Sequence, residues 1–186
     1  MAFLFEKTEI PEVIVITPQV FQDERGFFLE TYKKSEFTKQ GIAAEFKQDN
    51  HSLSKKGVFR GFHYQLNPFA QGKLVRVTSG SIIDFAIDIR KGSPNYGKHI
   101  SILLSKENRK MLWVPEGFAH GFYTLEDGTE VVYKATSEYS KEHEGGIVWS
   151  DEDLKIEFPS EPKIIVSDKD NALPKLKEGK SNFIYS

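Results

Sequence analysis

Alternation of apolar and polar residues with a period of two is the feature of this sequence that most constrains its fold. The segment 81–89 carries isoleucine or phenylalanine at every odd position from 83 to 89. The segment 73–77 alternates as well, with Lys73, Val75 and Val77 on one face and Leu74 and Arg76 on the other. Successive side chains of an extended strand point to opposite faces, so this spacing predicts β-strands.

The same pattern and the turn signals predict an all-β fold. Further strands are expected at 12–16, 26–32, 100–104, 111–114, 121–124 and 130–136, separated by turns rich in Gly, Ser, Asp and Pro. Two short helices are expected, one over Ser35–Gln40 that Ser35 caps and Gly41 stops, and one from Ser167 that ends before Pro174. Many short strands with glycine-rich turns are typical of a sandwich or jelly roll. No linker is visible, so we expect one domain over residues 1–186, ending in a polar tail.

The composition excludes several classes of protein. The formal net charge is −2 and no basic face stands out, so nucleic-acid binding is not expected. The chain has no cysteine, which excludes disulfides, thiolate nucleophiles and cysteine zinc sites. The N-terminal segment does not have the pattern of a signal peptide, and no apolar stretch is long enough to span a bilayer. We therefore expect a cytoplasmic protein that does not interact with membranes.

Five clusters contain side chains suited to catalysis or ligand binding, at 23–30, 48–52, 57–65, 71–77 and 113–122. The planar guanidinium of Arg60 suits phosphate oxygens, and His63 titrates near neutrality, as a general base should. Lys73 shares its strand face with two valines, so an inward orientation would place an ammonium in an apolar pocket. The polar run 48–52 suits hydrogen bonds to a sugar or phosphate, and it equally suits a plain turn.

The spacing of Pro115, Gly117 and His120 resembles the second motif of cupins, in which the histidine often binds a metal. Metal-binding cupins usually supply a His-x-His pair from their first motif, whereas this chain has His63-Tyr64-Gln65. The whole sequence contains five histidines, and tight transition-metal sites usually need three or more protein ligands. The sequence therefore favours a barrel without a metal.

Taken in order, these clusters resemble the dTDP-4-dehydrorhamnose 3,5-epimerase family over nearly the whole chain. Any one motif is weak, but their order and spacing together are highly specific. The matching segments are D-x-R-G-x-F-x-E at 23–30, Q-x-N-x-S at 48–52, R-G-x-H-Y-Q at 60–65, Q-G-K-L-V-R-V at 71–77, P-x-G-F-A-H-G-F at 115–122, Tyr133-Lys134, G-I-x-W-x-D at 146–151 and S-x-K-D at 167–170. The chain departs from the family pattern at 150–152 and at Phe62.

The resemblance implies an isomerase with a cupin-like jelly roll that inverts carbons 3 and 5 of dTDP-4-dehydro-6-deoxy-D-glucose without a metal or cofactor. It implies that His63 is the general base, oriented by Asp170, that Tyr133 is the acid and that Lys73 stabilises the oxyanion. It also implies a homodimer in which an N-terminal strand reaches the neighbour's pocket. The residues implied to bind substrate are Arg25, Phe28, Glu30, Gln48, Asn50, Arg60, His120, Glu144 and Lys169; Arg25, Phe28 and Glu30 are the ones on that strand.

Three alternatives remain open at this point. An epimerase that acts at a single carbon of a related nucleotide-linked 4-keto sugar would share every catalytic residue named above. A metal-dependent cupin isomerase or dioxygenase would contain stoichiometric metal. A sugar-binding barrel without turnover would bind ligand but would not exchange its protons with solvent.

Overall fold

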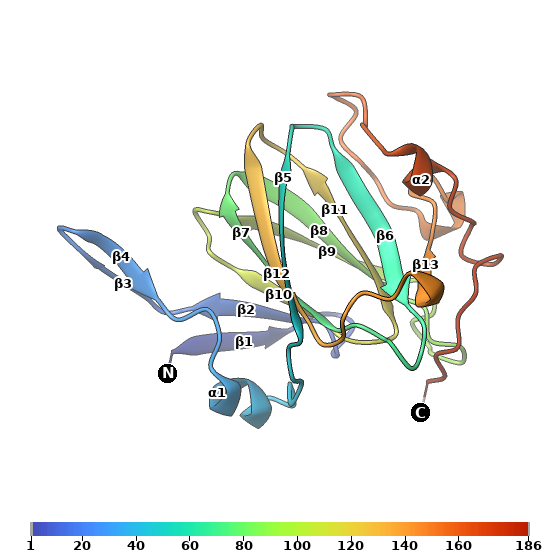
Figure 1. Cartoon of the computed structure of the whole chain (residues 1–186). Coiled ribbons are helices and arrows are strands. Elements are labelled where there is room, and N and C mark those ends of the chain that lie inside the picture. The colour runs from blue at the N-terminus through green and yellow to red at the C-terminus, as the bar shows by residue number, and fades with distance from the viewer. Residues whose placement is uncertain (1, 186) are drawn as a thin grey trace.

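The computed structural model describes residues 2–185 and has the jelly-roll architecture that the alternation predicts (Figure 1). One sheet has six strands, in the spatial order β1 (Phe3–Lys7), β2 (Ile14–Pro18), β10 (Met111–Val114), β7 (Lys73–Ser79), β12 (Thr129–Ala135) and β5 (Gln48–Ser54). The other has five, in the order β13 (Glu144–Gly146), β6 (Phe59–Gln65), β11 (Phe118–Thr124), β8 (Ser81–Asp88) and β9 (His99–Ser105). A separate hairpin of β3 (Val20–Asp23) and β4 (Gly26–Leu29) projects from the rest of the molecule.

The core lies between the two sheets because both turn an apolar face inward. Val75 and Val131 of the six-stranded sheet pack in one buried cluster with Ala86, Phe118 and Phe122 of the five-stranded sheet. A second cluster covers the other face of the five-stranded sheet and a third packs the short helix α1 (Lys34–Lys39) against the six-stranded sheet. Each sheet is therefore covered on part of both faces, which explains why strands such as β11 are buried along their whole length.

Several predicted elements differ in detail from the structure. The helix predicted over Ser35–Gln40 begins one residue earlier, and its N-cap is Lys33, which makes no side-chain capping bond, so the predicted cap at Ser35 is wrong. Ser167 does cap α2 (Asp168–Asn171), since its side chain accepts a hydrogen bond from the Asp170 N–H. The predicted strand 26–32 is too long: β4 ends at Leu29, because it pairs only with β3 across the turn that precedes Gly26.

The C-terminal segment is not merely the polar tail predicted from composition. Phe183 is buried in the second core cluster, and Ile184 forms a parallel bridge with Lys91. None of the helices within residues 2–185 has the length and apolarity needed to cross a membrane.

Candidate active site

A cavity of about 350 Å³ lies between residues of both sheets. This volume is within the range of about 300–1,000 Å³ that is usual for small-molecule sites. Strands β5, β7 and β12 of the six-stranded sheet and β6, β11 and β13 of the five-stranded sheet contribute to its wall, together with α2. The residues that line it are Ser52, Arg60, His63, Tyr64, Gln65, Gln71, Lys73, His120, Phe122, Tyr133, Tyr139, Glu144, Ser167, Lys169 and Asp170.

His63 and Asp170 form a hydrogen-bonded pair on one side of this cavity. His63 Nε2 lies 2.8 Å from Asp170 Oδ1, and the other carboxylate oxygen accepts the Gly61 N–H at 3.3 Å. Burial works to raise the pKa of Asp170, but the bonds from His63 and Gly61 outweigh it and hold that pKa below its usual value. Asp170 is therefore a carboxylate whose bond to His63 Nε2 fixes the orientation of the ring.

Gly61 lets the strand that carries His63 approach its neighbour closely. Its φ of +130° is one that side chains rarely adopt, and a Cβ there would lie 2.5 Å from the Gly121 Cα and 2.8 Å from the His120 oxygen. The glycine at this position thus brings β6 against β11 and presents its N–H to Asp170.

Tyr133 and Lys73 come from the opposite sheet. Tyr133 of β12 pairs with Val75 of β7, and the period of two puts Lys73 and Val75 on the same inward face. Lys73 is only 5% exposed, and burial lowers its pKa to about 8. Burial raises the pKa of Tyr133, which keeps its phenol protonated at neutral pH. The imidazole of His63 and the phenol of Tyr133 thus face one cavity from different sheets.

Asp84 is a buried group that the sequence analysis did not select. It is fully buried on β8, and its Oδ1 lies 2.7 Å from His120 Nε2, while His120 and Lys73 line the cavity. Burial raises the pKa of Asp84, and the nearby charges of His120 and Lys73 oppose the rise. The available signal was an aspartate on the same strand face as Ile82 and Ala86, both of which are completely buried.

A polar network forms the rim of the cavity. Lys169 Nζ lies 2.6 Å and 2.8 Å from the two carboxylate oxygens of Glu144, and the Tyr139 hydroxyl donates to the same carboxylate at 3.0 Å. Burial works to raise the pKa of Glu144, but these two partners hold it below its usual value. Tyr139, which is 55% exposed, is a second residue that the sequence analysis missed, because nothing in its local sequence separates it from a surface turn.

The substrate-binding residues implied by the resemblance do not all reach this cavity. Arg60, His120, Glu144 and Lys169 line it, as do the four implied catalytic residues. The hairpin of β3 and β4 projects from the barrel (Figure 1). Arg25 and Phe28 lie on this hairpin and Glu30 directly after it, and none of these three lines the cavity of its own chain.

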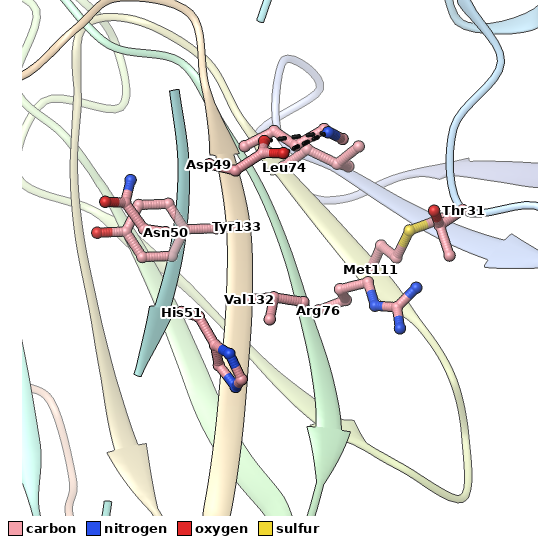
Figure 2. A pocket seen from close by; sticks show the side chains of 10 residues that line it. Thr31, Asp49, Asn50, His51, Leu74, Arg76, Met111, Val132 and Tyr133 are labelled. Carbon is pink, nitrogen blue, oxygen red and sulfur yellow. Dashed lines mark hydrogen bonds and ion pairs between the residues drawn. The ribbon is translucent and has the colours of Figure 1, made fainter. Parts of the chain in front are cut away.

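Gln48 and Asn50 lie on β5, next to the cavity but not among its lining residues. The Gln48 amide donates to Asn50 Oδ1 at 2.9 Å and accepts the Tyr139 N–H at 2.7 Å. Asn50 instead borders a second cavity of about 260 Å³, where Figure 2 shows it beside Tyr133, its partner in the β5–β12 register. That cavity is lined mainly by residues on the outer face of the six-stranded sheet, such as Arg76 and Val132.

The two histidines of the cavity pair with aspartates on separate elements. His63 bonds Asp170 of α2 and His120 bonds Asp84 of β8. Within residues 2–185, no group of three or more His, Asp or Glu side chains is arranged to hold a metal ion.

Comparisons with known proteins agree with the cavity's chemistry. Residues 7–178 match the family model described as dTDP-4-dehydrorhamnose 3,5-epimerase. The enzyme of that name from Shigella flexneri is 54% identical over 165 residues, which are 88% of this chain and 91% of that protein. The crystal structure of a dTDP-6-deoxy-D-glucose-3,5-epimerase from Legionella pneumophila, in complex with dTDP-4-keto-L-rhamnose, superimposes with a TM-score of 0.91 at 42% identity, covering 95% of this chain and 94% of that one. The chain belongs to the dTDP-4-dehydrorhamnose 3,5-epimerase family, and it is an isomerase.

Proposed function

We propose that this protein epimerises dTDP-4-dehydro-6-deoxy-D-glucose at carbons 3 and 5, through an enolate, to dTDP-4-dehydro-L-rhamnose. One observation carries the proposal: the imidazole of His63 and the phenol of Tyr133 face one cavity from opposite sheets, and the buried ammonium of Lys73 lines the same cavity. Inversion at a carbon needs a base on one face of the sugar ring and an acid on the other, and this arrangement supplies both.

The chemistry follows from the acidity of carbons next to a ketone. His63 takes the proton from carbon 3 or carbon 5, and the electron pair of the broken C–H bond moves to the carbonyl oxygen. Lys73 stabilises the resulting oxyanion, and Tyr133 returns a proton to the opposite face of the carbon. A positioned acid or base contributes about 10²- to 10⁴-fold, and one oxyanion donor contributes roughly 2.7–4 kcal/mol. Loss of any one of His63, Lys73 and Tyr133 is therefore expected to slow turnover by about 10²-fold or more.

The residues around these groups have supporting roles in the proposal. Asp170 orients His63, and Asp84 holds His120 through its bond to Nε2 and works to raise the pKa of Lys73. Arg60 and Lys169, together with Arg25 from the hairpin, bind the diphosphate, for which their charges are suited. Arg60 is held in place because its guanidinium donates to Ser54 Oγ at 3.0 Å and to the Leu53 carbonyl at 3.2 Å.

We also propose a homodimer in which the β3–β4 hairpin of each copy enters the cavity of the other. The hairpin projects from its own barrel (Figure 1). Phe28 on this hairpin is 68% exposed. Among the residues that the structure describes, 2–185, Arg25 forms an ion pair only with Asp23, at 2.6 Å. Its side chain is 85% exposed, so it can exchange this partner for a phosphate at little cost. Gln48 and Asn50 would then line the completed site beside Tyr139. The single domain and the cytoplasmic location stay predictions.

The experiment that tests the function is incubation of the protein with dTDP-4-keto-6-deoxyglucose in heavy water, followed by NMR at carbons 3 and 5. We expect deuterium at both carbons and inversion at both. Exchange confined to one carbon would contradict the double inversion, and no exchange at either carbon would contradict the enolate mechanism.

A further inference from the structure

The β3–β4 hairpin, called the arm below, forms a two-stranded sheet of its own outside the two main sheets. Phe21, Phe27 and Phe28 on it are 52%, 59% and 68% exposed. An isolated two-stranded hairpin is marginally stable in water, so the direction of the arm must be set by contacts at its base. The inference that follows rests on the proposed function, in which the arm completes the site of a second copy.

The alternation of β4 gives the two faces of the arm different neighbours. Phe27 and Leu29 border a small cavity of about 90 Å³ against the barrel, which Arg109 and Met111 also line. Phe28 lies on the other face of β4, Glu30 follows the end of this strand directly, and Arg25 lies in the turn between β3 and β4. Phe27 and Leu29 therefore face the barrel of their own chain, and Phe28 faces away from it.

Arg109 borders the same small cavity as the arm and is unusual in two ways. It has a φ of +52°, a left-handed conformation that a non-glycine residue adopts at a cost, and its Nε is buried without a hydrogen-bond partner within residues 2–185. The turn that carries it is fixed, because its N–H bonds the Ser105 carbonyl at 2.9 Å. The guanidinium carbon lies 4.3 Å from the centroid of the Phe27 ring, within the range of a cation–π contact.

We propose that Arg109 is a positioning residue that holds the arm, through the Phe27 ring, at the angle at which Arg25, Phe28 and Glu30 reach the cavity of a second copy. Arg109 does not line the catalytic cavity. Replacement of Arg109 is therefore expected to weaken substrate binding by the dimer and to leave the rate of the chemical step nearly unchanged.

The test compares Arg109→Ala, Arg109→Lys and the matched control Lys106→Ala in the full-length protein. Lys106 also borders the small cavity, but it pairs with Glu107 at 3.7 Å and is not stacked on Phe27. We expect Arg109→Ala to raise KM about fivefold, within the range of a lost cation–π contact, with kcat changed less than about twofold. Arg109→Lys should restore part of the affinity, and Lys106→Ala should match the wild type. A wild-type KM in Arg109→Ala overturns the proposal.

A double-mutant cycle of Arg109→Ala and Phe27→Leu distinguishes an effect through the Phe27 ring from a general effect on folding. If Arg109 acts through the Phe27 ring, the double variant has the KM of the more affected single variant, and amide hydrogen exchange over residues 20–29 is faster in all three. Independent, additive effects on KM contradict the proposal.

Arg25→Ala separates this inference from the function on which it rests. A raised KM in Arg25→Ala with a normal KM in Arg109→Ala overturns only the role of Arg109. A normal KM in Arg25→Ala overturns the role of the arm itself, and with it the inference, while the epimerisation measured by NMR stands.

Discussion

The interior of the cavity and the projecting arm differ in how their side chains are held. At the cavity, Asp170 in its wall and Asp84 behind His120 are buried, and each bonds a histidine, at 2.8 Å and 2.7 Å respectively. On the arm, the ion pair of Arg25 and Asp23 is local and exposed to solvent. Buried, paired groups keep one geometry, whereas exposed ion pairs contribute little and exchange partners readily. The difference supports the proposal that one chain holds the reacting groups and that a second copy completes the binding of substrate.

Replacement of His63 is expected to have the largest effect and tests the cavity side of this comparison. His63→Ala should lower kcat by about 10²- to 10⁴-fold, because it removes the group that takes the proton. Steady-state turnover measures the effect. His51→Ala is the matched control, since His51 lies on β5, pairs with Glu130 at 2.9 Å and does not line the cavity. A His63→Ala enzyme with more than a tenth of wild-type turnover would show that another group is the base.

Replacement of Asp84 tests the buried groups of the cavity through the pH dependence of kcat. Lys73 must be an ammonium to stabilise the oxyanion, so activity falls as pH rises through its pKa, which burial places at about 8. Asp84 works to raise that pKa, so Asp84→Asn should move the alkaline limb of the kcat profile to lower pH and reduce kcat about tenfold near pH 8. A kcat profile of Asp84→Asn with an unmoved alkaline limb would exclude this role. Thermal unfolding of the variant serves as the control for folding.

Replacement of Arg25 is expected to have a smaller effect and tests the arm. Arg25→Ala should raise KM about tenfold and leave kcat nearly unchanged, because one charge-assisted contact to the diphosphate is lost while the reacting groups remain. Lys134→Ala is a suitable control, since that lysine pairs with Asp49 on the same protein but outside the catalytic cavity. A fall in kcat at constant KM would instead place Arg25 among the reacting groups.

The parts of the fold that the sequence predicts well are those set by local strand patterning. The pattern predicts the strand 111–114 with its observed bounds, and it places Lys73 on one face with Val75 and Val77, because period-two patterning reports directly on strand faces. Whether that face points inward is left open by the pattern, and the structure shows that it is buried. Strand β5 was not predicted, because its polar residues alternate between the cavity side and solvent and leave no apolar pattern.

Other parts of the site depend on distant contacts that no local pattern encodes. His63 and Asp170 are 107 residues apart, and their pairing came from the family resemblance. The pattern of the segment 81–89 places Asp84 on one face with Ile82 and Ala86, but it does not reveal the contact with His120 that makes this buried aspartate part of the site. The helix start at Lys34 shows the same limit, since tertiary packing of Phe37 overrides the preference of Ser35 for the cap position.

The measurement that most directly tests the division of base and acid between the two sheets is proton exchange by Tyr133→Phe in heavy water. With His63 intact, this variant should still wash solvent deuterium into the substrate at carbon 3 or 5 with retention, while inversion falls by about 10²-fold or more. Normal inversion by Tyr133→Phe, with deuterium incorporation equal to that of the wild type, would contradict the account.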